Sequence, residues 1–202
     1  MILCGGRGTR LQEHTQEIPK PLVEIGGMPI VWHVIQLYAV QGFRRFLLAT
    51  GYKGELIERF VATHGWPPGV DVRCVDTGPQ TQTGGRIKLL APQLAGEELF
   101  CATYADGVAD IDLDALLAFH RDHGALATMT VVRPELQFGV TELAPDGTVK
   151  GFREKPRSDH WINGGFFCFA GPVLEYLDAD SVLERDPLDR LASAGELRAH
   201  RH

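Results

Sequence analysis

The sequence predicts an α/β fold with a mostly parallel, mixed sheet flanked by helices. Apolar segments rich in β-branched and aromatic residues recur along the chain, and helix-length amphipathic stretches separate them. The strand-like segments are residues 43–50, 70–75, 99–104, 125–132 and 165–169. Such alternation is typical of parallel strands joined by helices that cover the sheet. The 202 residues are enough for one sizeable core, so we expect a single domain over residues 1–202.

The chain opens on a short apolar strand, Met1-Ile2-Leu3, that runs into a glycine-rich turn at residues 5–10. Glycine there permits positive φ and lets main-chain N–H groups approach phosphate oxygens. Arg10, and Lys20 between two prolines, add permanent positive charge. The spacing matches neither the P-loop nor the dinucleotide-binding motif. The segment therefore predicts a polyphosphate site, with a plain tight turn as the alternative.

Three helices are predicted from apolar periodicity and from their end signals. They cover residues 29–39, 53–63 and 113–123, and a glycine stops the first and the third. Asp110 and Asp112 are expected to belong to the cap that begins the third helix.

A second glycine-containing loop at residues 77–86 precedes a predicted helix. Its hydroxyls, such as that of Thr81, and the bare backbone of Gly84 and Gly85 suit hydrogen bonds to a base edge or a ribose, and Arg86 suits a phosphate. Two glycines in a first helical turn cost about 1 kcal/mol each relative to alanine. Something other than helix stability therefore selects them.

Asp106 follows the predicted strand at residues 99–104. The carboxyl end of a strand in a parallel sheet is where ligand crevices open. Because Mg²⁺ binds one or two carboxylates together with substrate phosphates, Asp106 is a candidate metal ligand. The alternative is an Asp-Gly turn with a solvated side chain.

Two alternating runs between residues 138 and 153 predict a hairpin, and Asp146-Gly147 predicts its two-residue turn. We expect this hairpin beside the main sheet, framing a pocket. Further along, residues 182–194 are expected to be helical, and residues 197–200 are a candidate strand.

Lys155 and Asn163 are candidate ligands for a second phosphate and for sugar hydroxyls. Lys155 precedes a proline, which favours an extended backbone and a well-positioned side chain. Asn163 is followed by Gly164 at the start of a strand. Each of these segments alone is more often a turn, but together they predict a site for two ligands.

Composition excludes several classes of protein. The net charge of −6 argues against general nucleic-acid binding, which needs a basic face. No apolar run approaches the roughly 20 residues of a membrane span. The chain opens on strand residues rather than on a secretory signal, which predicts a cytoplasmic location.

The cysteines and histidines do not predict a metal site. Cys4, Cys74, Cys101 and Cys168 are far apart in the sequence and are interpreted as buried free thiols. His120 and His123 lack a third ligand nearby and are expected at surface or boundary positions, and His33 is interpreted as a satisfied core or interface residue.

The absence of a paired nucleophile and base from the sequence motifs bears on the type of reaction. A phosphate monoester has a second pKa of about 6, so it is largely dianionic at neutral pH and already nucleophilic. Catalysis of its in-line attack on a phosphorus atom then consists of positioning and charge neutralisation.

With these motifs in view, the chain resembles sugar-phosphate nucleotidyltransferases, and among them the glucose-1-phosphate cytidylyltransferases. The resemblance spans almost the whole chain. It is carried by residues 5–10, 19–21, 25–33, 51–54, 76–78, 83–86, 106–110, 154–156 and 162–167.

The resemblance implies a Rossmann-like nucleotidyltransferase fold and an Mg²⁺-dependent reaction of CTP with α-D-glucose 1-phosphate that gives CDP-glucose and pyrophosphate. It also implies residue roles. The residues implied to bind the nucleotide are Leu3, Cys4, Gly5, Gly6, Arg7, Gly8, Thr9, Arg10, Thr81, Gly84, Gly85 and Arg86. Those implied to bind the sugar phosphate are Glu154, Lys155, Asn163 and Gly164. The implied catalytic residues are Arg10, Lys20 and Asp106, and Asp106 is also the implied metal ligand.

The chain departs from the family pattern in three places. The first strand is short, Ala105 replaces the glycine usual before the metal aspartate, and the family's second metal aspartate lies beyond His202. The family's C-terminal segment, used for oligomer contacts, is therefore expected to be missing, and a homo-oligomer stays open. Two alternatives also stay open: dTTP or UTP as donor, and a catalytically weak module that binds nucleotide or sugar phosphate.

Overall fold

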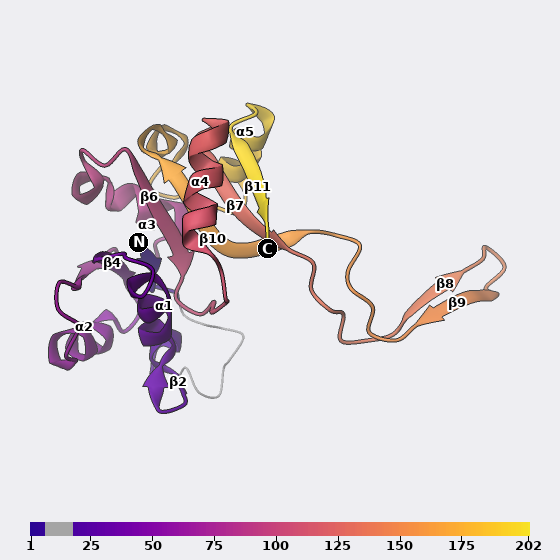
Figure 1. Ribbon diagram of the computed structural model, residues 1–202, viewed down its shortest axis with the longest axis horizontal. Helices are drawn as coiled ribbons and strands as arrows, with labels where there is room; N and C mark the ends of the chain where they lie inside the picture. The colour runs from indigo at the N-terminus through magenta and orange to yellow at the C-terminus, as the bar shows by residue number, and fades with distance from the viewer. Residues whose placement is uncertain (7–17) are drawn as a thin grey trace.

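The structure, a computed structural model, describes residues 1–6 and 18–202. A seven-stranded sheet runs through the molecule, with helices on both faces (Figure 1). Its strands, in spatial order, are β11 (Leu197–Arg201), β7 (Ala127–Val132), β10 (Ile162–Ala170), β6 (Leu99–Tyr104), β1 (Ile2–Leu3), β4 (Arg45–Thr50) and β5 (Asp71–Asp76). The predicted α/β fold with a mostly parallel, mixed sheet is confirmed.

The short first strand lies near the centre of this sheet. β1 pairs in parallel with β4 on one side and with β6 on the other, so that Ile2 is opposite both Leu48 and Thr103. Because the chain order reverses here, a crevice opens at the carboxyl end of β1. β10 runs antiparallel to β6 and β7, which brings its first residues to the same edge.

Alternate residues of each strand face opposite sides of the sheet, and each side has its own core. Ile2, Leu48 and Cys168 belong to one core, whereas Leu3 and Phe167 belong to the other. The period of two in the strands therefore builds two separate apolar layers.

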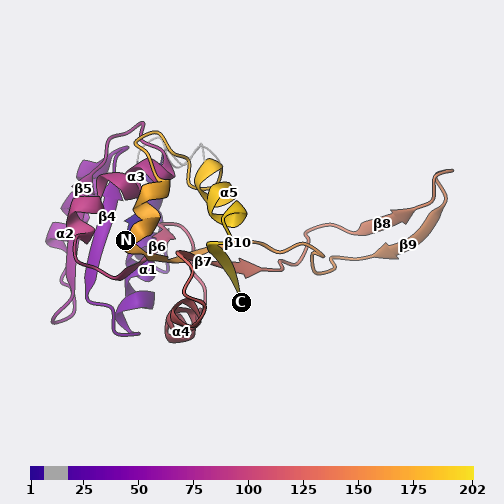
Figure 2. The same cartoon turned by 90° about the horizontal axis from the view of Figure 1, so that it is seen from above.

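The helices divide between these two layers (Figure 2). The first layer is covered by α1 (Ile30–Ala39), α2 (Gly54–Thr63) and α4 (Leu113–His123), and the second by α3 (Thr83–Leu89) and α5 (Asp186–Ser193). None of the helices in the described ranges is long and apolar enough to cross a lipid bilayer.

The predicted bounds of α1, α2 and α4 hold to within one residue. Asp112 is the N-cap of α4, and its carboxylate accepts a hydrogen bond of 2.9 Å from the Ala115 N–H. Gly124 ends the same helix with φ of 65°. The capping role assigned to Asp112 is confirmed.

The predicted helix over residues 182–194 is shorter than expected, because α5 begins only at Asp186. Pro187 lacks an N–H and is tolerated in a first helical turn but not in an interior. The candidate strand beyond it is confirmed as β11, which pairs in parallel with β7.

The predicted hairpin forms, but its place and its turn differ from the expectation. β8 (Val140–Leu143) and β9 (Val149–Arg153) make a separate two-stranded sheet that projects away from the body (Figure 1). We call residues 134–158 the β8–β9 arm. It leaves the end of β7 and returns to the start of β10, so it continues beyond the edge of the sheet instead of lying beside it.

The turn of the arm is wider than a two-residue Asp-Gly turn. The Gly147 N–H donates to the Ala144 carbonyl at 3.0 Å, and the Ala144 N–H donates to the Thr148 carbonyl at 2.8 Å. Pro145 suits the first central position of an ordinary turn, and Gly147 takes φ of 84°. The loop therefore holds three residues, Pro145 to Gly147.

The cysteines are free thiols, as predicted. Cys4, Cys101 and Cys168 are buried, and Cys74 is partly exposed. Burial raises the pKa of the Cys74 thiol to about 11. These side chains serve as small apolar residues of the core.

The histidines of α4 are less exposed than expected. His120 is buried, so its surface or boundary assignment is wrong, whereas His123 is partly exposed. Both rings hydrogen-bond the Thr128 hydroxyl across the face of β7. His33 is partly exposed, and its Nε2 atom lies 2.8 Å from the Ile25 carbonyl oxygen, which agrees with a satisfied histidine.

Candidate functional site

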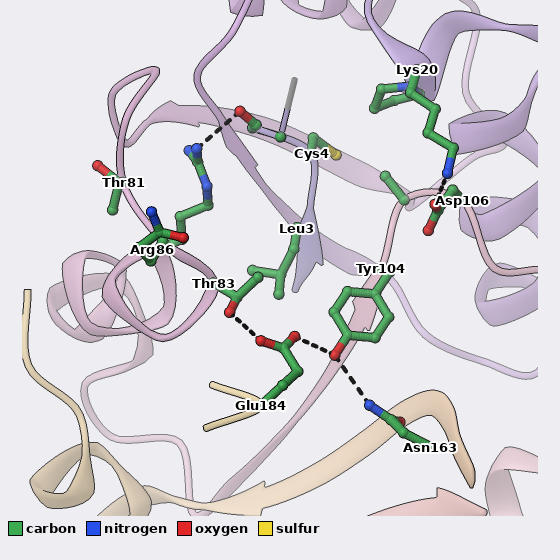
Figure 3. A pocket seen from close by; sticks show the side chains of 15 residues that line it. Leu3, Cys4, Lys20, Thr81, Thr83, Arg86, Tyr104, Asp106, Asn163 and Glu184 are labelled. Atoms are coloured by element: carbon green, nitrogen blue, oxygen red, sulfur yellow. Dashed lines mark hydrogen bonds and ion pairs between the residues drawn. The ribbon is translucent and has the colours of Figure 1, made fainter. Parts of the chain in front are cut away.

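A cavity of about 750 Å³ opens where the carboxyl ends of β1 and β6 meet the start of β10 (Figure 3). Segments that are far apart in the sequence form its wall. The lining residues are Leu3, Cys4, Gly5, Gly6, Lys20, Pro21, Thr81, Gln82, Thr83, Arg86, Tyr104, Ala105, Asp106, Asn163 and Glu184. This is the edge at which parallel sheets bind ligands.

The cavity collects many of the residues predicted from the sequence. Those in its lining are Leu3, Cys4, Gly5, Gly6, Lys20, Thr81, Arg86, Asp106 and Asn163. Gly84, Gly85, Glu154, Lys155 and Gly164 are not in the lining. Arg7, Gly8, Thr9 and Arg10 lie outside the described residues.

Lys20 and Asp106 form an ion pair on the wall of this cavity (Figure 3). Lys20 lies between Pro19 and Pro21 in a short 3₁₀ helix, and Asp106 follows β6 by two residues. Their side chains remain 26% and 37% exposed. A cation and a carboxylate thus face the same cavity from two different segments.

Arg86 is buried, with 3% of its surface exposed, and it joins the ends of three strands. Its guanidinium donates to the Gly5 carbonyl at 2.9 Å, to the Thr50 carbonyl at 2.8 Å and to the Thr77 hydroxyl. Burial lowers the pKa of this guanidinium. Arg86 therefore holds the loop after β1 against the ends of β4 and β5.

Two glycines make room for the Arg86 guanidinium. A Cβ atom at Gly5 would lie 1.9 Å from Arg86 Nη1, and one at Gly51 would lie 2.6 Å from the same atom. Gly5 is therefore required by close packing. Arg86 also fixes the direction of the Gly5 carbonyl. Because the peptide bond is trans, the Gly6 N–H points away from that carbonyl and therefore away from Arg86.

The adjacent glycines of α3 allow a neighbouring segment to approach. A Cβ atom at Gly85 would lie 2.0 Å from the Ala179 carbonyl oxygen, and one at Gly84 would lie 2.8 Å from Ser181 Cβ. The Gly85 N–H also donates to the Ser181 carbonyl at 3.0 Å. Close packing of the backbone thus explains two glycines that helix stability disfavours.

Comparison of the sequence with known proteins identifies its family. The family model of nucleotidyl transferases matches residues 1–193. The chain belongs to the nucleotidyl transferase family. It is 41% identical to the glucose-1-phosphate cytidylyltransferase of Salmonella typhimurium and to the probable glucose-1-phosphate cytidylyltransferase of Bacillus subtilis. In both cases the match covers 100% of this chain and 87% of the relative.

Solved structures of other proteins share the fold of this nucleotidyl transferase. HddC from Yersinia pseudotuberculosis, complexed with GMP-PN, superposes with a TM-score of 0.75 at 25% identity. The match covers 100% of this chain and 88% of that one.

Sequence reasoning missed a polar cluster on the cavity wall of this nucleotidyl transferase. The Glu184 carboxylate accepts hydrogen bonds from Tyr104 at 2.5 Å and from Thr83 at 2.6 Å. Asn163 in turn donates to the Tyr104 hydroxyl at 3.3 Å. Because Glu184 is 80 residues from Tyr104 in the sequence, no local pattern indicates the contact.

Lys155 differs from its predicted conformation. It has φ of 41°, not an extended backbone, because the chain bends there between β9 and the bridge that joins Glu135 to Arg157. Its side chain and that of Glu154 are exposed on the β8–β9 arm. Their predicted sugar-phosphate role stays a prediction.

Metal-binding side chains do not cluster in the described part of this nucleotidyl transferase. Within residues 1–6 and 18–202, no group of three or more His, Cys, Asp or Glu side chains is placed to hold a metal ion. Asp106 is a single carboxylate on the cavity wall and already faces a cation, the Lys20 ammonium. This donor set fits Mg²⁺, which takes few protein carboxylates and shares the phosphates of its substrate.

Proposed function

We propose that this chain transfers the cytidylyl group of CTP to α-D-glucose 1-phosphate and releases pyrophosphate. The observation that carries the proposal is the meeting of the Gly5-Gly6 loop, Lys20 and Asp106 in one cavity at the centre of the sheet. The 41% identity to glucose-1-phosphate cytidylyltransferases, over 87% of their length, supports the choice of both substrates.

The chemistry needs no general base. A phosphate oxygen of glucose 1-phosphate forms a bond to the α-phosphorus of CTP, and the bond from that phosphorus to the bridging oxygen of the β-phosphate breaks. Because the attacking monoester is largely dianionic at neutral pH, no proton has to be removed from it. The protein then contributes alignment and charge neutralisation.

The nucleotide side of the cavity is assigned to the loop after β1 and the loop before α3. Main-chain N–H groups at Gly5 and Gly6 would contact the phosphates, with Thr81 at the nucleoside. Arg7, Gly8, Thr9 and Arg10 keep the same assignment as a prediction from the family resemblance. Arg86 would act here largely by fixing the Gly5 carbonyl.

The sugar-phosphate side is assigned to the start of β10. Asn163 lines the cavity there. Gly164 packs against Thr130, whose Oγ1 would lie 2.9 Å from an added Cβ, so its predicted role would be to shape the backbone. Lys155 and Glu154 would require movement of the β8–β9 arm, or another copy of the chain, to reach a ligand in this cavity.

Asp106 is the residue that would hold Mg²⁺. Bound there, Mg²⁺ would neutralise negative charge on the triphosphate. Lys20, which contacts the same carboxylate, would supply a second positive charge on the phosphates. Its two flanking prolines restrict the backbone and so keep this ammonium near the cavity.

Several features support the remaining assignments. β11 pairs with β7 in the main sheet, which supports one catalytic domain over residues 1–202. Four free thiols agree with a reducing, cytoplasmic compartment.

The net charge of −6 agrees with small anionic substrates held locally rather than with a nucleic acid. Exposed apolar side chains on the β8–β9 arm support a homo-oligomer.

The test is pyrophosphate release with glucose 1-phosphate, Mg²⁺ and CTP, UTP or dTTP in separate reactions. Turnover with CTP well above that with the other two supports the proposal. Turnover mainly with UTP or dTTP would assign a different donor. Binding without turnover of all three triphosphates would identify a catalytically weak binding module instead.

A further inference from the structure

A chain of hydrogen bonds crosses the wall of the cavity from α3 to β10 (Figure 3). Thr83 donates to one oxygen of the Glu184 carboxylate at 2.6 Å, and Tyr104 donates to the other at 2.5 Å. Asn163 Nδ2 donates to the Tyr104 hydroxyl at 3.3 Å. All four side chains line the cavity in which the substrates are proposed to bind.

Backbone groups fix the direction of this chain at both ends. The Leu183 N–H donates to Thr83 Oγ1 at 2.9 Å, which leaves the hydroxyl proton of Thr83 for Glu184. The Gly165 N–H donates to Asn163 Oδ1 at 2.8 Å. Since a backbone N–H can only donate, Oδ1 must face Gly165, and the Nδ2 group must face Tyr104.

The carboxylate fixes the direction in the middle. Both of its oxygens accept, so the Tyr104 hydroxyl donates to Glu184 and uses a lone pair for Asn163. Burial, followed by the hydrogen bond to Glu184, raises the pKa of the Tyr104 hydroxyl, so that it stays protonated. The amide of Asn163 is thus held in one of its two orientations by contacts that agree with one another.

We infer that Glu184 and Tyr104 are positioning residues that orient Asn163 as a hydrogen-bond donor to the sugar phosphate. The inference rests on the proposed function, because it takes the sugar phosphate as the ligand of Asn163. One N–H of the Asn163 amide is used by Tyr104. The other has no partner within the described part of the chain, and it belongs to a side chain of the cavity wall.

The orientation of the Asn163 amide decides whether its N–H or its oxygen is presented to an anionic ligand. An amide N–H attracts an ionised phosphate oxygen, whereas the amide oxygen repels it. Without the Glu184 carboxylate, the Tyr104 hydroxyl is free to turn its proton toward Asn163, so that the Gly165 N–H alone still holds the amide in this orientation. Glu184 therefore acts on the ligand through two other side chains and does not need to contact it.

The test uses two variants of the full chain, Tyr104→Phe and Glu184→Gln, and measures KM separately for glucose 1-phosphate and for CTP. We expect each variant to raise KM for glucose 1-phosphate by about tenfold, the effect of misplacing one hydrogen bond to a charged group. KM for CTP should stay within about twofold of wild type. The double variant should resemble the single variants, because both changes interrupt the same chain.

Two matched controls separate this effect from a general loss of stability. Tyr176→Phe and Glu175→Gln make the same chemical changes outside the cavity, in the 3₁₀ helix Gly171–Tyr176. Both should retain the wild-type KM for each substrate. Thermal unfolding of all variants shows whether they are folded, and Glu184→Gln, at an exposed residue, tests the inference even if Tyr104→Phe unfolds.

The outcomes for the inference and for the proposed function are distinct. If wild-type protein makes no CDP-glucose but uses another donor, the proposed function fails, and the variants are compared with that donor. If no donor is turned over, the Kd for glucose 1-phosphate is measured by calorimetry for each variant and compared with the wild-type Kd. Unchanged KM and Kd for glucose 1-phosphate in both variants, equal increases for both substrates, or no binding of glucose 1-phosphate by wild-type protein would overturn the inference.

Discussion

At the scale of single residues, Arg86 shows how one buried charge can organise a binding loop. Its guanidinium spans the ends of β1, β4 and β5 through Gly5, Thr50 and Thr77. A buried guanidinium is tolerated when its donors have oxygen partners. The sequence predicts nucleotide-binding roles for Arg86 and Gly5, and both line the cavity, but their contact joins segments 81 residues apart and has no local signature.

Replacement of Gly5 by alanine should therefore destabilise the protein. The new Cβ would lie 1.9 Å from Arg86 Nη1, so the guanidinium has to leave the Gly5 carbonyl. We expect the free energy of unfolding to fall by about 1–3 kcal/mol, as measured by urea denaturation. Gly6→Ala is the matched control, since nothing lies within 4 Å of a Cβ atom at Gly6. Equal stability of the two variants would contradict the role given to Arg86.

At the scale of elements, local signals account for the helices and strands that sequence reasoning found. Periodicity and an aspartate cap define α4, and a glycine with positive φ ends it. The direction of the β8–β9 arm, in contrast, cannot be predicted from local sequence signals. Its alternation predicts a hairpin, but its direction depends on how β7 and β10 continue beyond the sheet, and that is a property of the tertiary structure.

The contact of α4 with β7 should make stability depend on pH. The Ala125 N–H donates to His123 Nδ1, so this ring is neutral and its Nε2–H faces the Thr128 hydroxyl, which in turn donates to His120. Burial lowers the pKa of both histidines. Positive charge lowers them further: the charge that His123 gains on protonation for His120, and the charge of Arg198 for His123.

Because both pKa values are lower in the folded protein, the unfolded chain binds more protons as the pH falls. The stabilisation is therefore fully present above the unfolded pKa of about 6.5 and is lost as the pH falls below it toward the folded values. We expect the melting temperature to drop between pH 7.5 and pH 5.5, and to drop less in a His120→Gln variant. A slope that is the same in both proteins would show that these histidines do not titrate on unfolding.

At the scale of the whole molecule, the arm and the cavity pose different problems for prediction. The cavity was predictable because its main chemical groups sit at strand ends, which a parallel sheet brings to one edge. Glu184 was not, because it reaches this edge from the segment before α5. The family fold was predictable from the density of ordered motifs, whereas the place of Lys155 depends on where the arm lies.

The exposed apolar side chains of the arm predict self-association. Phe138 is 81% exposed and Phe152 is 63% exposed. Burying two such aromatic side chains in an interface is favourable by about 2 kcal/mol or more each. We expect wild-type protein to be an oligomer by light scattering and Phe138→Ser/Phe152→Ser to have a lower mass. Val40→Ser, at another exposed apolar residue, should keep the wild-type mass. A monomeric wild type would contradict this prediction.

Transfer of the cytidylyl group is expected to depend on the charge of the Asp106 carboxylate, which lies opposite Lys20 in the cavity. Asp106→Asn keeps the shape of the side chain but removes its charge. The decisive measurement is pyrophosphate release by this variant, together with its calorimetric affinity for glucose 1-phosphate. We expect turnover to fall by about 100-fold or more while sugar-phosphate affinity changes little. Turnover equal to that of wild-type protein would contradict the account.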